Sequence, residues 1–356
     1  MNQMKNIDIK KLTQWYDQNK RNMPWRDTGN PYDIWLSEIM LQQTRIEAVK
    51  PKYIAFKNEL PDIASLANCD DDRLMRLWEG LGYYSRARNL KKCAIYLMEH
   101  YDGKLPKDFE LLKKLPGIGP YTAGAIASIA YNLPAPAIDG NVLRVLTRYY
   151  GITEDIRLPK VKEIIEDKLN DFYSSKHLDS SFSSFNQGIM ELGETVCVPN
   201  GVPQCQRCPL NKNCYASQNN MTDSIPYRSS LKERKIVERT LFVIRDDQSF
   251  LIHKRPHKGL LAGLYEFPGV DAHLTKSEMI SHVESLGFTP LKITTLPDAK
   301  HIFTHLEWHM RAYEIKVAEI QHTLDDHYYL VNKKELQSLA IPSAFRKYTD
   351  WYSLRD

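Results

Sequence analysis

Two carboxylate residues are the first candidates for chemistry in this chain. Glu38 falls within the apolar run of residues 35–41, and Asp139 follows a proline-rich bend. A carboxyl group among apolar side chains has a raised pKa, so Glu38 could stay protonated near neutral pH and act as a general acid. A helical glutamate is nevertheless more often solvated than catalytic, so these residues alone leave the role open.

The element that would position Asp139 is a glycine turn between helices. Residues 115–120 read Leu-Pro-Gly-Ile-Gly-Pro, in which Gly117 and Gly119 bracket one isoleucine, and an Ala/Ile-rich helical run follows over residues 121–131. Such a turn directs N–H groups at the start of the second helix outward, where they can bind one phosphate. The Gly-Lys-Ser/Thr ending of a nucleotide-binding loop is missing, and a plain turn between packed helices stays an alternative.

The composition is that of an ordinary globular chain with room for two or three domains. Of 356 residues, 26% are charged and 42% hydrophobic, and the net charge is +4, so a polyanionic partner must meet a local basic face. The sequence has no apolar run near the ~18 residues that span a membrane. Its N-terminus lacks the apolar core of a secretory signal. We therefore expect no membrane association and a cytoplasmic, nucleoid-associated protein.

The periodicity of the chain changes from helical to β along its length. Residues 10–215 have apolar positions three and four apart, which predicts a series of short helices. A polar stretch without periodicity ends near residue 238. Residues 240–254 and 301–317 then alternate like strands, and a helix is expected at about residues 276–286.

Four of the six cysteines fall in one short window. Gaps of seven, two and five residues separate them, which in a cytosolic chain indicates metal binding more readily than disulfides. Their spacing fits a structural zinc site and a [4Fe–4S] cluster about equally well. The four residues are Cys197, Cys205, Cys208 and Cys214.

Residues 35–44, Trp-Leu-Ser-Glu-Ile-Met-Leu-Gln-Gln-Thr, closely resemble the adenine DNA glycosylases of MutY type, which belong to the helix-hairpin-helix glycosylase superfamily. The resemblance extends from about residue 12 to residue 351. It implies a multidomain protein: an all-α helix-hairpin-helix glycosylase core with an iron–sulfur module, plus an α+β Nudix-like C-terminal domain. The expected ranges are 1–220 for the helical region, 221–238 for a linker and 239–356 for 8-oxoguanine recognition. Within the helical region, about 30–135 form the hairpin part, and 1–29 with 136–220 form the iron–sulfur part.

The resemblance also implies the substrate and the roles of individual residues. A monomer would act on duplex DNA in which adenine is mispaired with 8-oxoguanine or guanine, and would flip the adenine out. Glu38 would protonate the adenine, and Asp139 would stabilise the sugar by its field or by a transient covalent bond, with Tyr121 and Asn141 assisting. Gln187 is a weaker candidate for reading adenine. The residues expected to contact DNA are Gln43, Thr44, Leu81, Tyr83, Gly117, Gly119, Gln187, Phe303, Thr304 and His305.

This chain departs from the family pattern in its first cysteine gap and at Thr304, and its C-terminal domain departs from a working Nudix hydrolase. The family favours an iron–sulfur cluster, but its first cysteine gap commonly holds six residues rather than seven. A working Nudix hydrolase needs a glutamate six positions after Gly269, where this chain has Thr275, and the following helix offers only Glu278 and Glu284. Magnesium ligation of the usual kind is therefore missing, which favours recognition over hydrolysis. Phe303-Thr304-His305 stands where the family has Phe-Ser-His and keeps the hydroxyl.

Two rival functions remain. A bifunctional glycosylase-lyase of the endonuclease III kind needs an amine nucleophile two residues after Gly119. That position is Tyr121, and no lysine occurs between Lys114 and Lys160. A Nudix-type nucleotide hydrolase or a purely DNA-binding protein would put the active part of the chain in the C-terminal domain. The missing metal carboxylates argue against the hydrolase, and the pair of Glu38 and Asp139 argues against mere binding.

Overall fold

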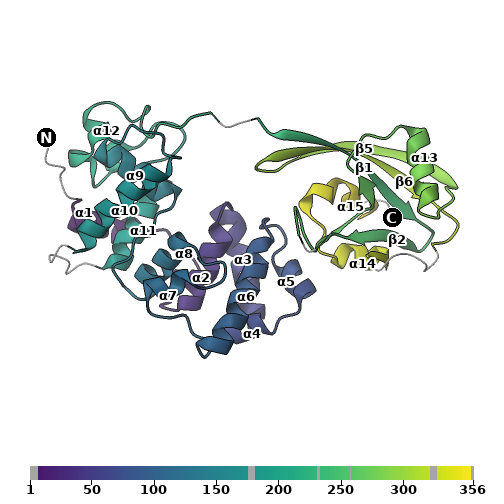
Figure 1. Ribbon diagram of the computed structural model, residues 1–356. Helices are drawn as coiled ribbons and strands as arrows, with labels where there is room; N and C mark the ends of the chain where they lie inside the picture. Colours follow the sequence, from purple (N-terminus) through teal and green to yellow (C-terminus); the bar gives the residue numbers. More distant parts are fainter. Residues whose placement is uncertain (1–6, 175–180, 231–232, 257, 321–326, 354–356) are drawn as a thin grey trace. The chain divides into compact units, whose positions relative to one another are not determined.

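The computed structural model describes residues 7–174, 181–230, 233–256, 258–320 and 327–353. The chain divides into two compact units, one made of residues 1–69 and 88–230 and the other of residues 70–87 and 231–356. Figure 1 traces the helices of the first unit and the strands of the second along the sequence. Among the described residues, no helix combines the length and the apolar character that crossing a membrane requires.

The first unit is built from helices, as the 3.6-residue periodicity predicts. Several of them begin at a side chain that accepts a backbone N–H of the first turn, such as Asn30, which is followed by Pro31 at the first helical position. The α-helices are α1 (Ile9–Asn19), α2 (Pro31–Leu41), α3 (Ile46–Glu59), α4 (Ile63–Ala67), α6 (Ser85–His100, which begins in the other unit), α7 (Phe109–Lys113), α8 (Pro120–Ala125), α9 (Gly140–Tyr150), α10 (Pro159–Ser174), α11 (Phe182–Thr195) and α12 (Tyr215–Gln218). Short 3₁₀ turns cover Cys205–Arg207 and Asn211–Asn213.

The predicted glycine turn joins α7 to α8. Gly117 has φ +73°, and a Cβ there would lie 2.6 Å from the Cβ of Asn89, so both the backbone conformation and the close packing require glycine. Gly119 is the N-cap of α8, with Pro120 at the first helical position. The helical run predicted over residues 121–131 is confirmed, but its second half, Ile126–Ala130, is a π-helical turn.

The segment that leads to Asp139 packs tightly against α8. A Cβ on Gly124 would lie 1.9 Å from the carbonyl oxygen of Pro136, so a larger residue would displace this segment. Asp139 is the N-cap of α9, and its side chain accepts from the N–H of Val142. Close backbone packing and a helix cap therefore fix the position of the second carboxylate.

A hydrophobic cluster of the helical unit packs α1, α9, α10 and α11 together. It contains Leu12, Leu146, Ile165 and Leu192, none of which is measurably exposed. Cys197, Cys208 and Cys214 pack against the same cluster. The cysteine window is thereby attached to the helix that begins at Asp139.

The second unit contains a seven-stranded mixed sheet with the order β3-β2-β1-β6-β5, to which β4 adds on β1 and β7 on β2. Strands β1 and β6 pair in parallel, and every other described pair is antiparallel. The strands are β1 (Lys235–Arg245), β2 (Ser249–Lys254), β3 (Tyr265–Glu266), β4 (Gly269–Val270), β5 (Lys292–Ile302), β6 (Leu306–Lys316) and β7 (Tyr328–Asn332). The two strand-like runs and the helix predicted in this region are confirmed.

Helices cover both faces of the sheet (Figure 1). Leu241 and Val243 of β1 face a core shared with Phe345 and Tyr348, whereas the alternate residues Phe242 and Ile244 face a core that includes α13. This alternation is the period-two pattern of a strand buried on both sides. The helices of this unit are α5 (Asp71–Leu77), α13 (Lys276–Ser285), α14 (Lys333–Ser338) and α15 (Arg346–Ser353), with a 3₁₀ turn at Ser343–Phe345.

Candidate active site

Glu38 lies in the most deeply buried helix of the site, α2. Every residue from Tyr32 to Met40 is buried, and Glu38 is 8% exposed. Burial raises the pKa of its carboxyl group to about 7, because a charged form is poorly solvated there. The burial of Glu38 that its apolar neighbours predict is therefore confirmed.

Three groups around Glu38 modify this pKa. The hydroxyl of Tyr121, at the start of α8, donates a hydrogen bond to the carboxylate, which lowers the pKa, as does the positive charge of Arg26. The negative charge of Asp139 raises it. Burial and both carboxylates hold the pKa of Tyr121 well above its usual value, so the tyrosine stays a hydrogen-bond donor.

Asp139 is held by two amide donors. Its Oδ1 accepts from the N–H of Val142 at 2.7 Å, and its Oδ2 accepts from Nδ2 of Asn141 at 2.8 Å. Burial raises the pKa of Asp139, while these hydrogen bonds favour the ionised form. The second contact places Asn141 beside Asp139, which it is expected to assist. The structure thus brings Glu38, Tyr121, Asp139 and Asn141 into one site.

A chain of hydrogen bonds leads from Asn141 to the cysteine window. Oδ1 of Asn141 accepts from the buried Arg144 at 2.7 Å, and Arg144 donates to the carbonyl oxygen of Cys197 at 2.8 Å and to that of Gly193 at 2.8 Å. A Cβ on Gly193 would lie 2.6 Å from the Cβ of Asn141, so glycine is needed for this packing.

Sequence reasoning missed a buried ion-pair group beside the site. The side chain of Glu191 in α11 is 0% exposed and lies 2.5 Å from Arg26 and 2.5 Å from Arg21. These two arginines lower its pKa despite burial. Glu191 stands in the run Ile-Met-Glu-Leu, the same signal of a lone glutamate among apolar residues that identified Glu38.

Gln187 lies on the same helix and is engaged at both ends of its amide. Its Oε1 accepts from the hydroxyl of Tyr16 at 2.9 Å, and its Nε2 donates to Ser183 at 3.1 Å. The guanidinium of Arg26 lies over the ring of Tyr16 at 5.7 Å. Arg26 therefore links the environment of Glu38 to that of Gln187.

All four cysteines of the window line one pocket. Each carries a free thiol and is partly exposed. The buried Arg148 donates to Sγ of Cys197 at 3.2 Å and also to the carbonyl oxygens of Ile225 and Thr222. Among the described residues, no three His, Cys, Asp or Glu side chains are arranged to hold a single metal ion. The pocket is lined by Arg148, Val196, Cys197, Pro203, Cys205, Cys208, Asn211, Cys214, Ser217 and Thr222.

Gln43 and Thr44 lie just beyond the C-terminal end of α2. Gln43 is exposed and has φ +56°, a left-handed backbone that is uncommon for a residue other than glycine. The preceding Gln42 donates to Oγ1 of Thr122 at 3.3 Å, which ties this end of α2 to α8. Gln43 is thus the exposed tip of a turn that Gln42 ties to α8.

In the second unit, Tyr83 and Thr304 meet. Their hydroxyl oxygens are 2.6 Å apart. Thr304 and His305 are exposed in the turn between β5 and β6, whereas Phe303 packs edge-on against Trp308, with 4.8 Å between the ring centroids. Tyr83 is 47% exposed but Leu81 is only 4% exposed, so Tyr83 is the accessible one of these two expected DNA contacts.

Comparisons with known proteins agree with this arrangement. Residues 36–171 match the HhH-GPD superfamily of base excision DNA repair proteins, and residues 240–351 match the NUDIX domain. The adenine DNA glycosylase of Buchnera aphidicola subsp. Acyrthosiphon pisum is 31% identical to this chain over 94% of each protein. The chain belongs to the adenine DNA glycosylase family. It is a base-excision repair glycosylase, a hydrolase of N-glycosyl bonds, as the sequence predicts.

Two further matches support the adenine DNA glycosylase family and its fold. The adenine DNA glycosylase of Buchnera aphidicola subsp. Baizongia pistaciae is 33% identical over 83% of this chain and 82% of that protein. A solved structure of a thermostable thymine-DNA glycosylase superposes with a TM-score of 0.53 and 25% identity, covering 59% of this chain and 95% of that one. The expected combination of a helical hairpin region and a Nudix-like domain is confirmed.

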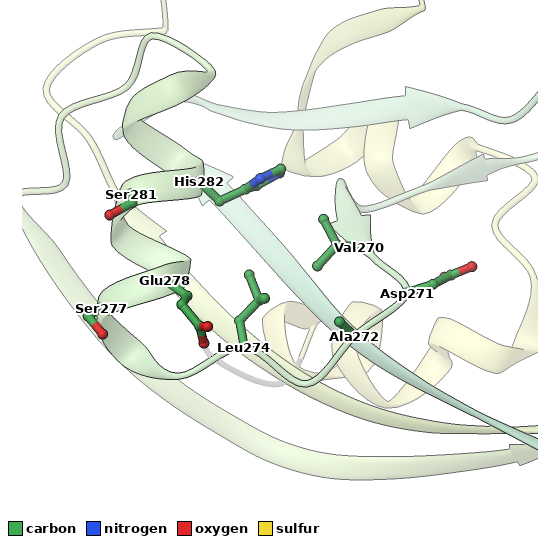
Figure 2. Close-up of a pocket in the computed structure, with 8 residues that line it drawn as sticks. All are labelled: Val270, Asp271, Ala272, Leu274, Ser277, Glu278, Ser281 and His282. Carbon is green, nitrogen blue, oxygen red and sulfur yellow. The ribbon is translucent and has the colours of Figure 1, made fainter.

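The Nudix-like domain of this glycosylase has a groove beside α13 (Figure 2). Glu278, one of its two lining carboxylates, accepts from the N–H of Thr275 at 2.8 Å and so caps its own helix. The other, Asp271, pairs with Arg239 at 2.8 Å. Both carboxylates therefore have structural partners. The lining residues are Val270, Asp271, Ala272, Leu274, Ser277, Glu278, Ser281 and His282.

Proposed function

We propose that this glycosylase excises adenine mispaired with 8-oxoguanine, or with guanine, from duplex DNA. The observation that carries the proposal is the buried Glu38 carboxyl, with a pKa of about 7, in a site that also holds the Asp139 carboxylate. Hydrolysis of an N-glycosidic bond needs both an acid for the leaving base and a negative charge near the sugar. The geometry supports this division of roles between two carboxyl groups.

The reaction begins when adenine is flipped out of the duplex into the site. Glu38 donates its proton to a ring nitrogen of the adenine, which makes the base a better leaving group. As the bond between C1′ and the base breaks, its electron pair moves to the adenine and the sugar gains oxocarbenium character. The Asp139 carboxylate stabilises this charge by its field or by a transient bond to C1′. Water adds at C1′, with cleavage of any bond that Asp139 has formed there, and passes its proton to the Glu38 carboxylate, which leaves free adenine, an abasic site and the restored acid.

Tyr121 and Asn141 hold the two carboxyl groups during these steps. Tyr121 hydrogen-bonds Glu38, and Asn141 hydrogen-bonds Asp139 at 2.8 Å. Tyr121 also stands where a lyase of the endonuclease III kind needs its amine, and its raised pKa disfavours a nucleophilic phenolate. We therefore propose a monofunctional enzyme that leaves an abasic site without breaking the strand.

Arg26 is our first candidate for recognising the adenine edge. Its side chain is 13% exposed, lies near Glu38, and is oriented by the fully buried Glu191. A guanidinium donates to ring nitrogens of adenine and has no acceptor. Gln187 is the second candidate, although Tyr16 and Ser183 already engage its amide.

The duplex around the flipped adenine would be contacted by both units. Gly117 and Gly119 present the N–H groups of the hairpin to a phosphate, and Gln43 with Thr44 enters the gap left by the adenine. Tyr83, the exposed member of the pair, flanks the partner base, with Leu81 buried in the same loop. Thr304 recognises 8-oxoguanine with its hydroxyl, and Phe303 and His305 shape that turn. The contact between Tyr83 and Thr304 supports their assignment to the same base.

A [4Fe–4S] cluster is our proposed cofactor for the cysteine pocket. Four free thiols that line one pocket are a donor set that fits such a cluster, and Cys197, Cys205, Cys208 and Cys214 would hold it. When bound, it would supply structural cross-linking of this loop rather than bond-cleavage chemistry. Arg148 donates toward Cys197 Sγ, as expected beside a thiolate. The expected helical region of residues 1–220 would then include an iron–sulfur part.

The proposal is tested by incubating the purified protein with a labelled duplex that carries adenine opposite 8-oxoguanine. Strand breaks that appear only after alkali would support base excision without lyase activity. Breaks before alkali, with borohydride trapping of a protein–DNA adduct, would instead support the endonuclease III-like alternative. Intact strands after alkali would contradict the proposed substrate.

A further inference from the structure

The loop that carries Tyr83 has an unusual backbone. Gly80, Gly82 and Tyr83 all have positive φ angles, of +88°, +69° and +46° respectively. The two glycines adopt this region without a steric cost, but for a bulky residue it is a strained conformation that the surroundings must stabilise. Tyr83 is nevertheless 47% exposed. Contacts from neighbouring residues must therefore stabilise the left-handed conformation of this exposed tyrosine.

Arg86, in the first turn of α6, lies beneath this loop. It is only 8% exposed, and its Nη2 donates to the carbonyl oxygen of Leu81 at 2.7 Å and to that of Gly82 at 3.0 Å. The indole N–H of Trp78 donates to the same Gly82 carbonyl at 3.0 Å. Three side-chain donor contacts therefore converge on the two peptide carbonyls that immediately precede Tyr83.

The guanidinium also contacts aromatic faces. It lies 5.4 Å from the ring centroid of Trp78 and 5.6 Å from that of Tyr83. Burial lowers the pKa of Arg86 to about 10, which still leaves it charged at neutral pH. A planar cation can bond carbonyls in its plane and contact rings on its faces, whereas a lysine ammonium offers a point charge without that geometry.

We propose that Arg86 is a positioning residue that holds Tyr83 in its exposed left-handed conformation and thereby sets the preference for 8-oxoguanine over guanine opposite adenine. The inference rests on the proposed function, because it takes Tyr83 as a contact of the partner base. Arg86 itself is buried under the loop and acts through Tyr83. It leaves the excision chemistry at Glu38 and Asp139 unchanged.

The test compares Arg86→Met and Arg86→Lys with the wild type by affinity for duplexes that carry a non-cleavable adenine analogue. The partner base is 8-oxoguanine in one duplex and guanine in the other. The ratio of the two dissociation constants should fall by roughly tenfold in Arg86→Met, since charged hydrogen bonds are lost. The ratio for Arg86→Lys should fall nearly as far, because a lysine charge does not restore the hydrogen-bond geometry of the guanidinium. Arg76→Met, at an exposed arginine of α5, controls for the lost charge and should leave the ratio unchanged.

A double-mutant cycle separates positioning from general damage. In a Tyr83→Ala background, Arg86→Met should change the affinity ratio by less than about twofold, because its effect passes through Tyr83. A full tenfold effect in that background would overturn the proposal. So would an Arg86→Lys variant that retains the wild-type ratio. Active-site titration of each variant removes the contribution of unfolded protein.

A spectroscopic measurement keeps this inference distinct from the proposed function. 2-Aminopurine placed next to 8-oxoguanine should brighten when wild-type Tyr83 unstacks it, and should brighten much less with Arg86→Lys. Equal brightening with both proteins would contradict the role of Arg86. If the wild type brightens the probe but excises no adenine, the proposed reaction fails while the role of Arg86 stands.

Discussion

The pKa of Glu38 can be tested through the pH dependence of excision, because the hydrogen bond from Tyr121 predicts the direction in which the pH midpoint moves when that bond is removed. A general acid must be protonated, so the excision rate should fall as pH rises through the pKa. With a pKa of about 7, about half of the enzyme is active at pH 7, about a tenth at pH 8 and about 1% at pH 9. The hydrogen bond from Tyr121 favours the ionised carboxylate and so lowers this pKa. Tyr121→Phe removes that bond and should raise the midpoint.

The size of the shift follows from the strength of the lost bond. A hydrogen bond to a charged group is worth about 1.5 to 3 kcal/mol, and 1.4 kcal/mol corresponds to about one pH unit, so the midpoint should move up by about one to two units. Single-turnover excision with saturating enzyme, from about pH 6 to about pH 10, measures it without interference from product release. A midpoint that falls, or a rate that rises with pH in the wild type, would show that Glu38 is not the acid.

Three other substitutions examine separate parts of the site. Asp139→Asn should lower single-turnover excision by at least about 10²-fold, because the sugar cation loses its counter-charge while asparagine still caps α9. The pH midpoint of its residual activity should be lower than that of the wild type, because the negative charge that raises the pKa of Glu38 is gone. Circular dichroism checks the fold. Thr304→Val should weaken binding to adenine opposite 8-oxoguanine by about 1 to 2 kcal/mol and binding opposite guanine much less, and equal losses on both duplexes would assign Thr304 a structural role. Purified wild-type protein should be brown and contain iron. Cys205→Ser should lose iron and DNA affinity before it alters bond cleavage in the complex that still forms. Stoichiometric zinc without iron in anaerobically prepared protein would exclude the cluster.

The parts of the site that the sequence could predict are those set by local periodicity. Glu38 is buried because its neighbours in α2 are apolar, and a 3.6-residue repeat makes that visible without a structure. The glycine turn is likewise predictable from the sequence, because Gly117 and Gly119 flank one residue before a proline. Family resemblance then supplied the roles of Asp139 and Tyr121, and their contacts agree with it.

Long-range packing accounts for what could not be predicted. Glu191 carries a local signal of burial, but its two arginine partners lie 165 and 170 residues away in sequence, so no local pattern reveals the ion pairs. The parallel pairing of β1 with β6 joins residues about 70 positions apart and is not visible in either strand. The sequence predicts both Leu81 and Tyr83 as DNA contacts. Leu81 is nevertheless buried and Tyr83 is exposed, and a shared motif does not show which side chain points outward.

The most direct test of the central claim is single-turnover excision by Glu38→Gln on a duplex with adenine opposite 8-oxoguanine. Glutamine keeps the size of the side chain and can accept the Tyr121 hydrogen bond, but it has no proton of suitable acidity to donate. Loss of a general acid lowers the rate by about 10² to 10⁴, or about 3 to 5 kcal/mol. We expect the upper end of that range with duplex affinity nearly unchanged. A variant whose rate stays within tenfold of the wild type would contradict the assignment of Glu38 as the acid.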